Sequence, residues 1–151
     1  MKIAVGFDHA GFPLKPTIVD AVRSHGGEIV DCGAYSLTPD DDYPDFASAV
    51  ARAVLDGRAE RGVLVCGSGV GASVAANKFR GIRSALCHDT FSAHQGVEDD
   101  SMNVIAMGAR VIGPSLAAEI VSAFIGAKFS GAERHRRRLE KVLSFEAHRD
   151  D

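Results

Sequence analysis

Short apolar runs alternate along the chain with longer segments of helical periodicity, and most of the runs end in polar or glycine residues. A run of about five apolar residues is typical of a strand buried in a parallel sheet. The pattern predicts strands at residues 3–7, 28–31, 62–66, 84–87 and 104–107. It predicts helices over about 13–26, 44–57, 72–79 and 115–127, and from about 132 into the 140s. Strands that alternate with helices indicate an α/β protein with a three-layer, Rossmann-like fold, in which helices cover both faces of a five-stranded parallel sheet.

Polar side chains follow two of the predicted strands at the point where each strand ends. Asp8 and His9 come directly after the first strand, and Cys66 ends the third. Ligands of parallel sheets bind at the carboxyl ends of the strands. We therefore expect these three residues to lie together at a ligand site.

Composition narrows the class of protein. The chain has 151 residues, 46% of them hydrophobic and 25% charged, which fits a single domain over residues 1–151. A formal charge of −3 does not favour nucleic acid or a membrane as a partner, and no apolar run reaches the roughly 18 residues of a membrane span. Three scattered cysteines without a CxxC pair indicate neither a disulfide framework nor a metal site. These features predict a cytoplasmic protein.

A glycine loop, Gly67-Ser68-Gly69-Val70-Gly71, joins the third predicted strand to a helix. Glycines at such a turn let backbone N–H groups approach an anion closely. The loop lacks the Gly-Lys-Ser/Thr ending of a nucleotide-binding P-loop and the spacing of the dinucleotide fingerprint. The loop alone is equally consistent with an anion site and with a plain tight turn.

Cys66 stands directly before this loop. A thiol beside a helix N-terminus has a pKa below its ordinary value of about 8.5. The thiolate can take a proton from a carbon next to a carbonyl, and N–H groups of the loop can hold the resulting enediolate oxygen. The alternative is a buried core cysteine, which is our interpretation of Cys32 and Cys87.

Six motifs occur in one order along nearly the whole chain: Asp8-His9-Ala10-Gly11, Asp42-Tyr43-Pro44-Asp45, Cys66 to Gly71, Ala75-Ala76-Asn77-Lys78, Gly108-Ala109-Arg110 and Arg134-His135-Arg136-Arg137-Arg138. Together they resemble ribose-5-phosphate isomerase type B, in the group that includes the galactose-6-phosphate isomerase subunits. The resemblance implies an aldose–ketose isomerase of a small phosphorylated sugar, with ribose 5-phosphate and ribulose 5-phosphate as the default pair. It implies no metal and no organic cofactor.

The resemblance also implies roles for individual residues. Cys66 would be the base that moves a proton between C1 and C2, with Ser68 beside it, and Asp8 and His9 would contact sugar oxygens. The implied substrate-binding residues are Asp8, His9, Gly67, Ser68, Gly69, Val70, Gly71, Asp100, Arg110, Arg134 and Arg138. The acidic segment at Asp42-Tyr43 either shapes the sugar pocket or is simply solvated.

Two arginines of the C-terminal helix suit a phosphate. Arg134 and Arg138 are four residues apart, so their side chains leave the same helical face. Arginine binds phosphate through bidentate, charge-assisted hydrogen bonds; the alternative is a solvated basic face. In the family, the C-terminal helix reaches a neighbouring subunit, so the resemblance implies a homodimer or tetramer with shared active sites.

The sequence departs from the family at the residues that open the sugar ring. A His-Asn pair is usual there, and Asp99 and Asp100 take its place. Aspartic acid, with an ordinary pKa of about 3.9, is a poor general acid at neutral pH unless it is buried. Three explanations stay open: a buried, protonated Asp99; another histidine among His9, His88 and His94; or a substrate without a ring.

Alternative functions follow from this departure. A tetrose 4-phosphate such as erythrulose 4-phosphate cannot close a furanose ring, and a hexose 6-phosphate is another candidate substrate. A non-catalytic sugar-phosphate-binding module would also keep the loop. The thiol of Cys66 argues against such a module, because binding alone needs only N–H groups and arginines.

Overall fold

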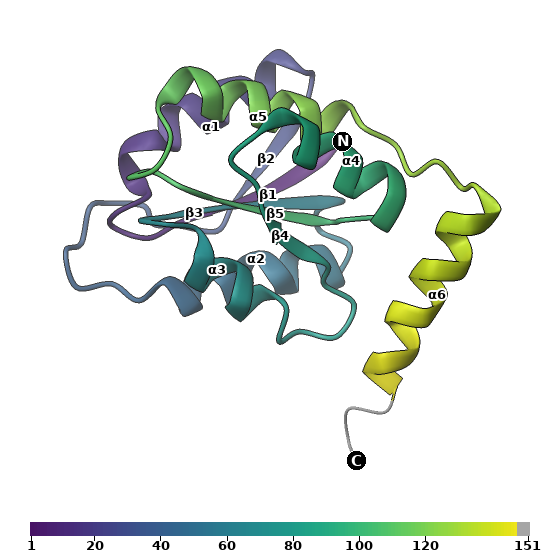
Figure 1. Ribbon diagram of the computed structural model, residues 1–151. Coiled ribbons are helices and arrows are strands. Elements are labelled where there is room, and N and C mark those ends of the chain that lie inside the picture. Colours follow the sequence, from purple (N-terminus) through teal and green to yellow (C-terminus); the bar gives the residue numbers. More distant parts are fainter. Residues whose placement is uncertain (148–151) are drawn as a thin grey trace.

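Five parallel strands form one sheet in the order β2-β1-β3-β5-β4 (Figure 1). The computed structural model describes residues 1–147. The strands are β1 (Lys2–Phe7), β2 (Glu28–Asp31), β3 (Arg61–Cys66), β4 (Ser84–Leu86) and β5 (Val104–Gly108). The helices are η1 (Phe12–Leu14), α1 (Lys15–Ser24), α2 (Tyr43–Leu55), α3 (Val70–Ala76), α4 (Thr90–Asp100), α5 (Pro114–Gly126) and α6 (Glu133–Ala147). The predicted α/β fold with a five-stranded parallel sheet is confirmed.

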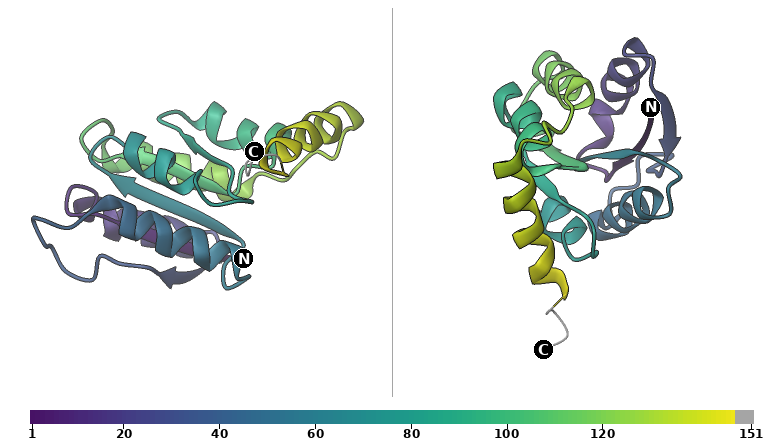
Figure 2. Two further views of the ribbon diagram at one scale, coloured as in Figure 1. Left: turned by 90° about the horizontal axis from the view of Figure 1, so that it is seen from below. Right: turned by 90° about the vertical axis from the view of Figure 1, so that its right-hand side faces the viewer.

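Helices cover both faces of the sheet: α1, α4 and α5 lie on one face, and α2 and α3 on the other (Figures 1 and 2). Alternate side chains of each strand enter different cores. On β1, Ile3 and Val5 belong to the core under α1 and α5, whereas Ala4 packs under α2. The strands read as continuous apolar runs because both faces of the sheet are buried.

The carboxyl ends of β1, β3 and β5 meet at one edge of the sheet. Phe7 pairs with Val65, and Cys66 pairs with Gly108. The chain therefore leaves three neighbouring strands side by side, and the segments that follow them share one edge. This register positions the site described below.

Two helices differ from their predicted bounds for local reasons. The segment predicted as helical from Pro13 begins with the 3-10 turn η1, and α1 starts only at Lys15. Proline fits the first turn of a helix but cannot donate a backbone hydrogen bond, and Pro13 and Pro16 lie at the starts of η1 and α1. Helix α3 ends at Ala76, before the predicted residue 79, and the Asn77 side chain then donates hydrogen bonds to the carbonyls of Ser73 and Ser84.

Helix α6 leaves the body on the side opposite the glycine loop (Figures 1 and 2). A hydrogen bond of 2.9 Å from Ser130 N to Glu98 O and one of 3.1 Å from Gly81 N to Glu146 hold its two ends. Val142 and Phe145 of this helix are 48% and 71% exposed. Within residues 1–147, no helix is both long and apolar enough to cross a bilayer.

Candidate active site

A cavity of about 330 Å³ opens at the carboxyl edge of the sheet. Its lining residues come from the segments that follow β1, β3 and β5 and from the starts of α2 and α3: Asp8, His9, Ala10, Tyr43, Cys66, Gly67, Ser68, Gly71, Arg110 and Val111. The structure thus brings together Asp8, His9 and Cys66 at the two strand ends and Arg110, which the family resemblance implied.

The Cys66 side chain lies at the junction of β3 and the glycine loop, only 5% exposed. Its Sγ accepts a hydrogen bond from the N–H of Gly69 at 3.0 Å. Gly69 has φ of +81°, a left-handed conformation that favours glycine. An N–H donor directed at sulfur stabilises negative charge there.

The other two cysteines lie outside the cavity. Burial raises the pKa of the Cys87 thiol to about 11, and burial also raises the pKa of Cys32. Both side chains therefore stay protonated at neutral pH. Their interpretation as core or strand-edge residues agrees with their burial, because Cys87 packs in one core and Cys32 against the other.

The shape of the glycine loop depends on its close contact with the end of β5. A Cβ atom on Gly108 would lie 2.6 Å from the carbonyl carbon of Ser68. Two backbone hydrogen bonds, from Ala109 N to Cys66 O at 2.9 Å and from Arg110 N to Gly67 O at 3.0 Å, tie the segments together. Arg110 is thereby fixed beside the loop.

Replacing Gly108 with alanine should therefore displace the glycine loop. We expect the free energy of unfolding to fall by about 1–3 kcal/mol from overpacking, and turnover to fall with it, because the loop N–H groups move. Thermal denaturation and steady-state kinetics measure the two effects. Gly126→Ala is the matched control, since a Cβ there meets nothing within 4 Å. Equal behaviour of the two variants would contradict the role of this contact.

Tyr43 forms a wall of the cavity. A Cβ atom on Gly71 would lie 2.6 Å from the Tyr43 ring, so the ring lies directly against the backbone of the loop. Asp42 is exposed and does not line the cavity. The sequence left open whether this acidic segment forms a pocket wall or is solvated. Tyr43 forms part of the wall, and Asp42 is solvated.

Asp8 and His9 enter the cavity from the end of β1. Asp8 is 6% exposed, and its Oδ1 accepts a hydrogen bond from Gly11 N at 2.8 Å. His9 contacts Asp41, whose Oδ1 lies 2.8 Å from both the backbone N and the ring Nδ1 of His9. The hydrogen bond to Asp41 raises the pKa of His9 above its ordinary 6.5. Sequence reasoning missed Asp41, because nothing distinguishes it from its acidic neighbours along the chain.

The other two histidines considered for ring opening lie outside the cavity lining. The Nε2 of His88 accepts a hydrogen bond from Gly108 N at 2.9 Å, so this ring supports the end of β5. His94 shares α4 with Asp99, and its Nδ1 lies 3.0 Å from Glu98. Of the three histidines, His9 alone faces the cavity.

Four predicted site residues, Asp99, Asp100, Arg134 and Arg138, lie away from Cys66, on the end of α4 and on α6. Asp99 accepts a hydrogen bond from Gln95 at 2.7 Å and lies 3.4 Å from Nε2 of the buried His135. The neighbouring Arg134 donates from Nε to the same His135 atom at 3.0 Å. The side chain of Asp99 is 32% exposed, so one chain alone does not enclose it in apolar surroundings.

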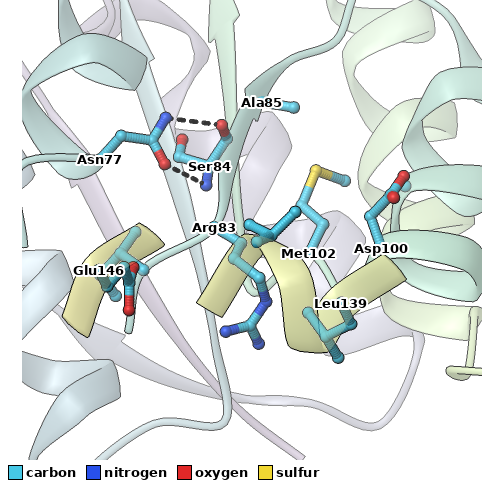
Figure 3. A pocket seen from close by; sticks show the side chains of 11 residues that line it. Asn77, Arg83, Ser84, Ala85, Asp100, Met102, Leu139 and Glu146 are labelled. Atoms are coloured by element: carbon cyan, nitrogen blue, oxygen red, sulfur yellow. Dashed lines mark hydrogen bonds between the residues drawn. The ribbon is translucent and has the colours of Figure 1, made fainter. Parts of the chain in front are cut away.

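Asp100 lines a second cavity, of about 370 Å³, between α6 and the body of the protein (Figure 3). Leu139 and Glu146 of α6 border it on one side, and Arg83 and Met102 on the other. The predicted site residues thus form two groups within one chain, one around Cys66 and one where α4 meets α6. Within the described part of the chain, no three His, Cys, Asp or Glu side chains are placed to hold a metal ion.

The parallel α/β sheet brings a thiol, a glycine loop and an arginine into one cavity. This combination fits a sugar-phosphate isomerase, the class of enzyme to which the sequence comparison assigns the chain. The sequence model of the Ribose/Galactose Isomerase family matches residues 3–142, and the chain belongs to this family.

Known relatives extend over almost the whole chain. Ribose-5-phosphate isomerase B of Escherichia coli (strain K12) is 45% identical over 149 residues, which is 99% of each chain. The D-erythrulose-4-phosphate isomerase of Pectobacterium atrosepticum is 46% identical over 134 residues, 87% of this chain and 86% of the relative. The structure of ribose-5-phosphate isomerase B from Mycoplasma genitalium with bound ribulose-5-phosphate superposes with a TM-score of 0.90 at 35% identity, covering 97% and 96% of the two chains.

Proposed function

We propose that the protein interconverts ribose 5-phosphate and ribulose 5-phosphate through a cis-enediolate, with Cys66 as the base. The observation that carries this proposal is the single cavity that holds the Cys66 thiol, the glycine loop and Arg110. The E. coli relative and the ribulose-5-phosphate complex of the M. genitalium protein support the choice of sugar. Membership of an isomerase family favours this enzyme over a non-catalytic binding module.

The proposed reaction moves hydrogen within one molecule. The Cys66 thiolate takes the proton from C2 of open-chain ribose 5-phosphate. The electron pair of the C–H bond forms the C1–C2 double bond, and the carbonyl oxygen on C1 becomes the negatively charged oxygen of the enediolate. N–H groups of Gly67 to Gly71 hold that oxygen, with the Ser68 hydroxyl beside it. Return of the proton from sulfur to C1, with transfer of the O2 proton to O1, completes ribulose 5-phosphate. Atoms and electrons balance without any external oxidant or reductant.

The phosphate is proposed to be bound by arginines of two chains. Arg110 is in the cavity, whereas Arg134 and Arg138 are on α6 at the opposite edge of the sheet. A helix that leaves the body with Val142 and Phe145 exposed is suited to packing against a second copy. We therefore propose a homodimer or tetramer in which Asp99, Asp100, Arg134 and Arg138 of one chain complete the Cys66 site of another.

The cellular location is proposed from the cysteines. Cys32, Cys66 and Cys87 are all free thiols. Free thiols are typical of a reducing compartment, which supports the cytoplasm.

A second candidate substrate is erythrulose 4-phosphate. Asp99 carries a carboxylate at the position where pentose-phosphate members of the family usually have the ring-opening histidine, and it contacts His135 rather than an apolar wall. A tetrose 4-phosphate has its 4-hydroxyl esterified, so it needs no ring opening. The 46% identity to the P. atrosepticum D-erythrulose-4-phosphate isomerase favours the same alternative.

A side-by-side isomerisation assay tests the proposal. We expect ribose 5-phosphate to be turned over with kcat/KM of at least about 10⁴ M⁻¹ s⁻¹, the lower end for an enzyme on its main substrate. Ribulose 5-phosphate and erythrulose 4-phosphate are measured with the same preparation. If kcat/KM for the tetrose exceeds that for the pentose by about 10²-fold or more, the size of one general acid contribution, the tetrose is the substrate and ring opening is absent.

A further inference from the structure

Asp41 holds the cavity-lining histidine from behind. Its Oδ1 lies 2.8 Å from the backbone N of His9 and 2.8 Å from the ring Nδ1. Because one oxygen accepts both N–H groups, the ring is fixed relative to its own backbone. The Asp41 side chain is 12% exposed, whereas its neighbours Asp40 and Asp42 are exposed. This carboxylate therefore differs from the rest of the acidic loop.

The second carboxylate oxygen of Asp41 indicates that the His9 ring beside it is protonated. Oδ2 is buried, and it has no hydrogen-bond partner among residues 1–147. A buried carboxylate oxygen without a donor is costly unless a cation lies close by. Within the contacts described for this loop, His9 is the group that can supply the cation.

Other titratable groups line the same cavity as His9. Asp8 adjoins it on the end of β1, Cys66 ends β3, Arg110 follows β5 and Tyr43 begins α2. The hydrogen bond to Asp41 raises the pKa of His9 above 6.5, and the charge of Asp8 adds to this effect. The surroundings of the ring therefore favour its protonated form.

We propose that Asp41 is a positioning residue of the isomerase: its carboxylate holds His9 as an imidazolium with Nδ1–H bonded to Asp41, so that Nε2–H is presented to the anionic group of the substrate beside Arg110. The inference rests on the proposed function for the identity of that group, a sugar phosphate. It assigns a role to a residue that makes no contact with the cavity itself.

The proposal has a pH signature. A phosphate ester becomes a dianion above its second pKa of about 6, while His9 loses its charge as the pH rises through its raised pKa. Binding is therefore strongest between these two values and weakens above the pKa of His9. Without the Asp41 charge, the pKa of His9 falls, and the weakening begins at a lower pH.

The experiment compares Asp41→Asn with Asp40→Asn, a matched change of one charge in the same loop. Asparagine keeps an oxygen for the His9 backbone N–H but removes the negative charge. We expect Asp41→Asn to raise KM for the sugar phosphate, and the inhibition constant of inorganic phosphate, about 10-fold at pH 7.5, the size of one charge-assisted hydrogen bond. We expect kcat to change by less than about 3-fold, as for loss of uniform binding, and the alkaline rise of KM to move to lower pH.

A titration of the His9 ring by NMR provides a reading that does not depend on turnover. The pKa of His9 should fall in Asp41→Asn and stay unchanged in Asp40→Asn. An unchanged pKa of His9 together with unchanged phosphate inhibition would overturn the proposal, as would equal effects of the two variants. Because inorganic phosphate and the NMR titration need no catalysis, this result is separable from a failure of Cys66 as the base.

Discussion

Replacing Cys66 with alanine is expected to lower isomerisation by about 10³-fold, within the range of one general base. The thiol is 5% exposed, accepts the Gly69 N–H at 3.0 Å and lines the cavity with Ser68. Alanine leaves the loop and Arg110 in place but offers no group to take the C2 proton. The measurement is steady-state turnover, together with exchange of the substrate C1 and C2 hydrogens in deuterated water.

Two controls separate chemistry from packing. Cys87→Ala removes another buried thiol, one whose pKa burial raises to about 11, so its loss should reduce stability but leave the exchange reaction intact. Inhibition by inorganic phosphate should survive in Cys66→Ala, because Arg110 and His9 are unchanged. Exchange that continued at the wild-type rate in Cys66→Ala would remove Cys66 as the base.

Most of the fold follows from the sequence because both faces of the sheet are buried. A strand such as Val63-Leu64-Val65 is apolar at every position and ends at a glycine loop, so its bounds are visible from composition alone. The bounds of helices are harder to predict. The 3-10 turn at Pro13 and the early end of α3 at Ala76 depend on local hydrogen bonds that the periodicity of apolar residues does not report.

The site divides into a part that the sequence predicts and a part that it does not. Asp8, His9 and Cys66 end neighbouring parallel strands, so topology alone brings them together. Asp41 is different, because only the path of its loop in space selects it from three consecutive aspartates. Tyr43 likewise becomes a cavity wall through its contact with Gly71, which no spacing rule predicts.

The position of α6 bears on which chain's cavity its arginines can complete. Arg134 and Arg138 do not line the cavity of their own chain, and α6, which carries them, projects away from the body of the protein (Figure 1). A closed two-fold dimer presents the same surface of each chain to the other. Each site would then take Cys66 from one chain and the arginine pair from its partner.

Mixing two inactive variants should therefore restore activity. The first chain carries Cys66→Ala, and the second carries Arg134→Ala with Arg138→Ala, which we expect to lower kcat/KM by about 10³-fold, from two charge-assisted bonds. In a mixed dimer, one site collects all the substitutions and the other has none. Mixed dimers isolated with two different affinity tags should thus show about half the wild-type activity, the share of intact sites in a two-fold dimer.

A matched control uses Arg137→Ala in place of the arginine pair. Arg137 is exposed and pairs with Glu133 at 3.0 Å on the same helix, so its loss should leave the unmixed enzyme active. If the mixed dimers of the inactive variants stay as inactive as either parent, each site is built within one chain. In that case α6 would have to move toward the cavity of its own chain, because Arg134 does not line that cavity in the structure. Restored activity instead requires that α6 act on the neighbouring chain, and it makes assembly a condition for catalysis.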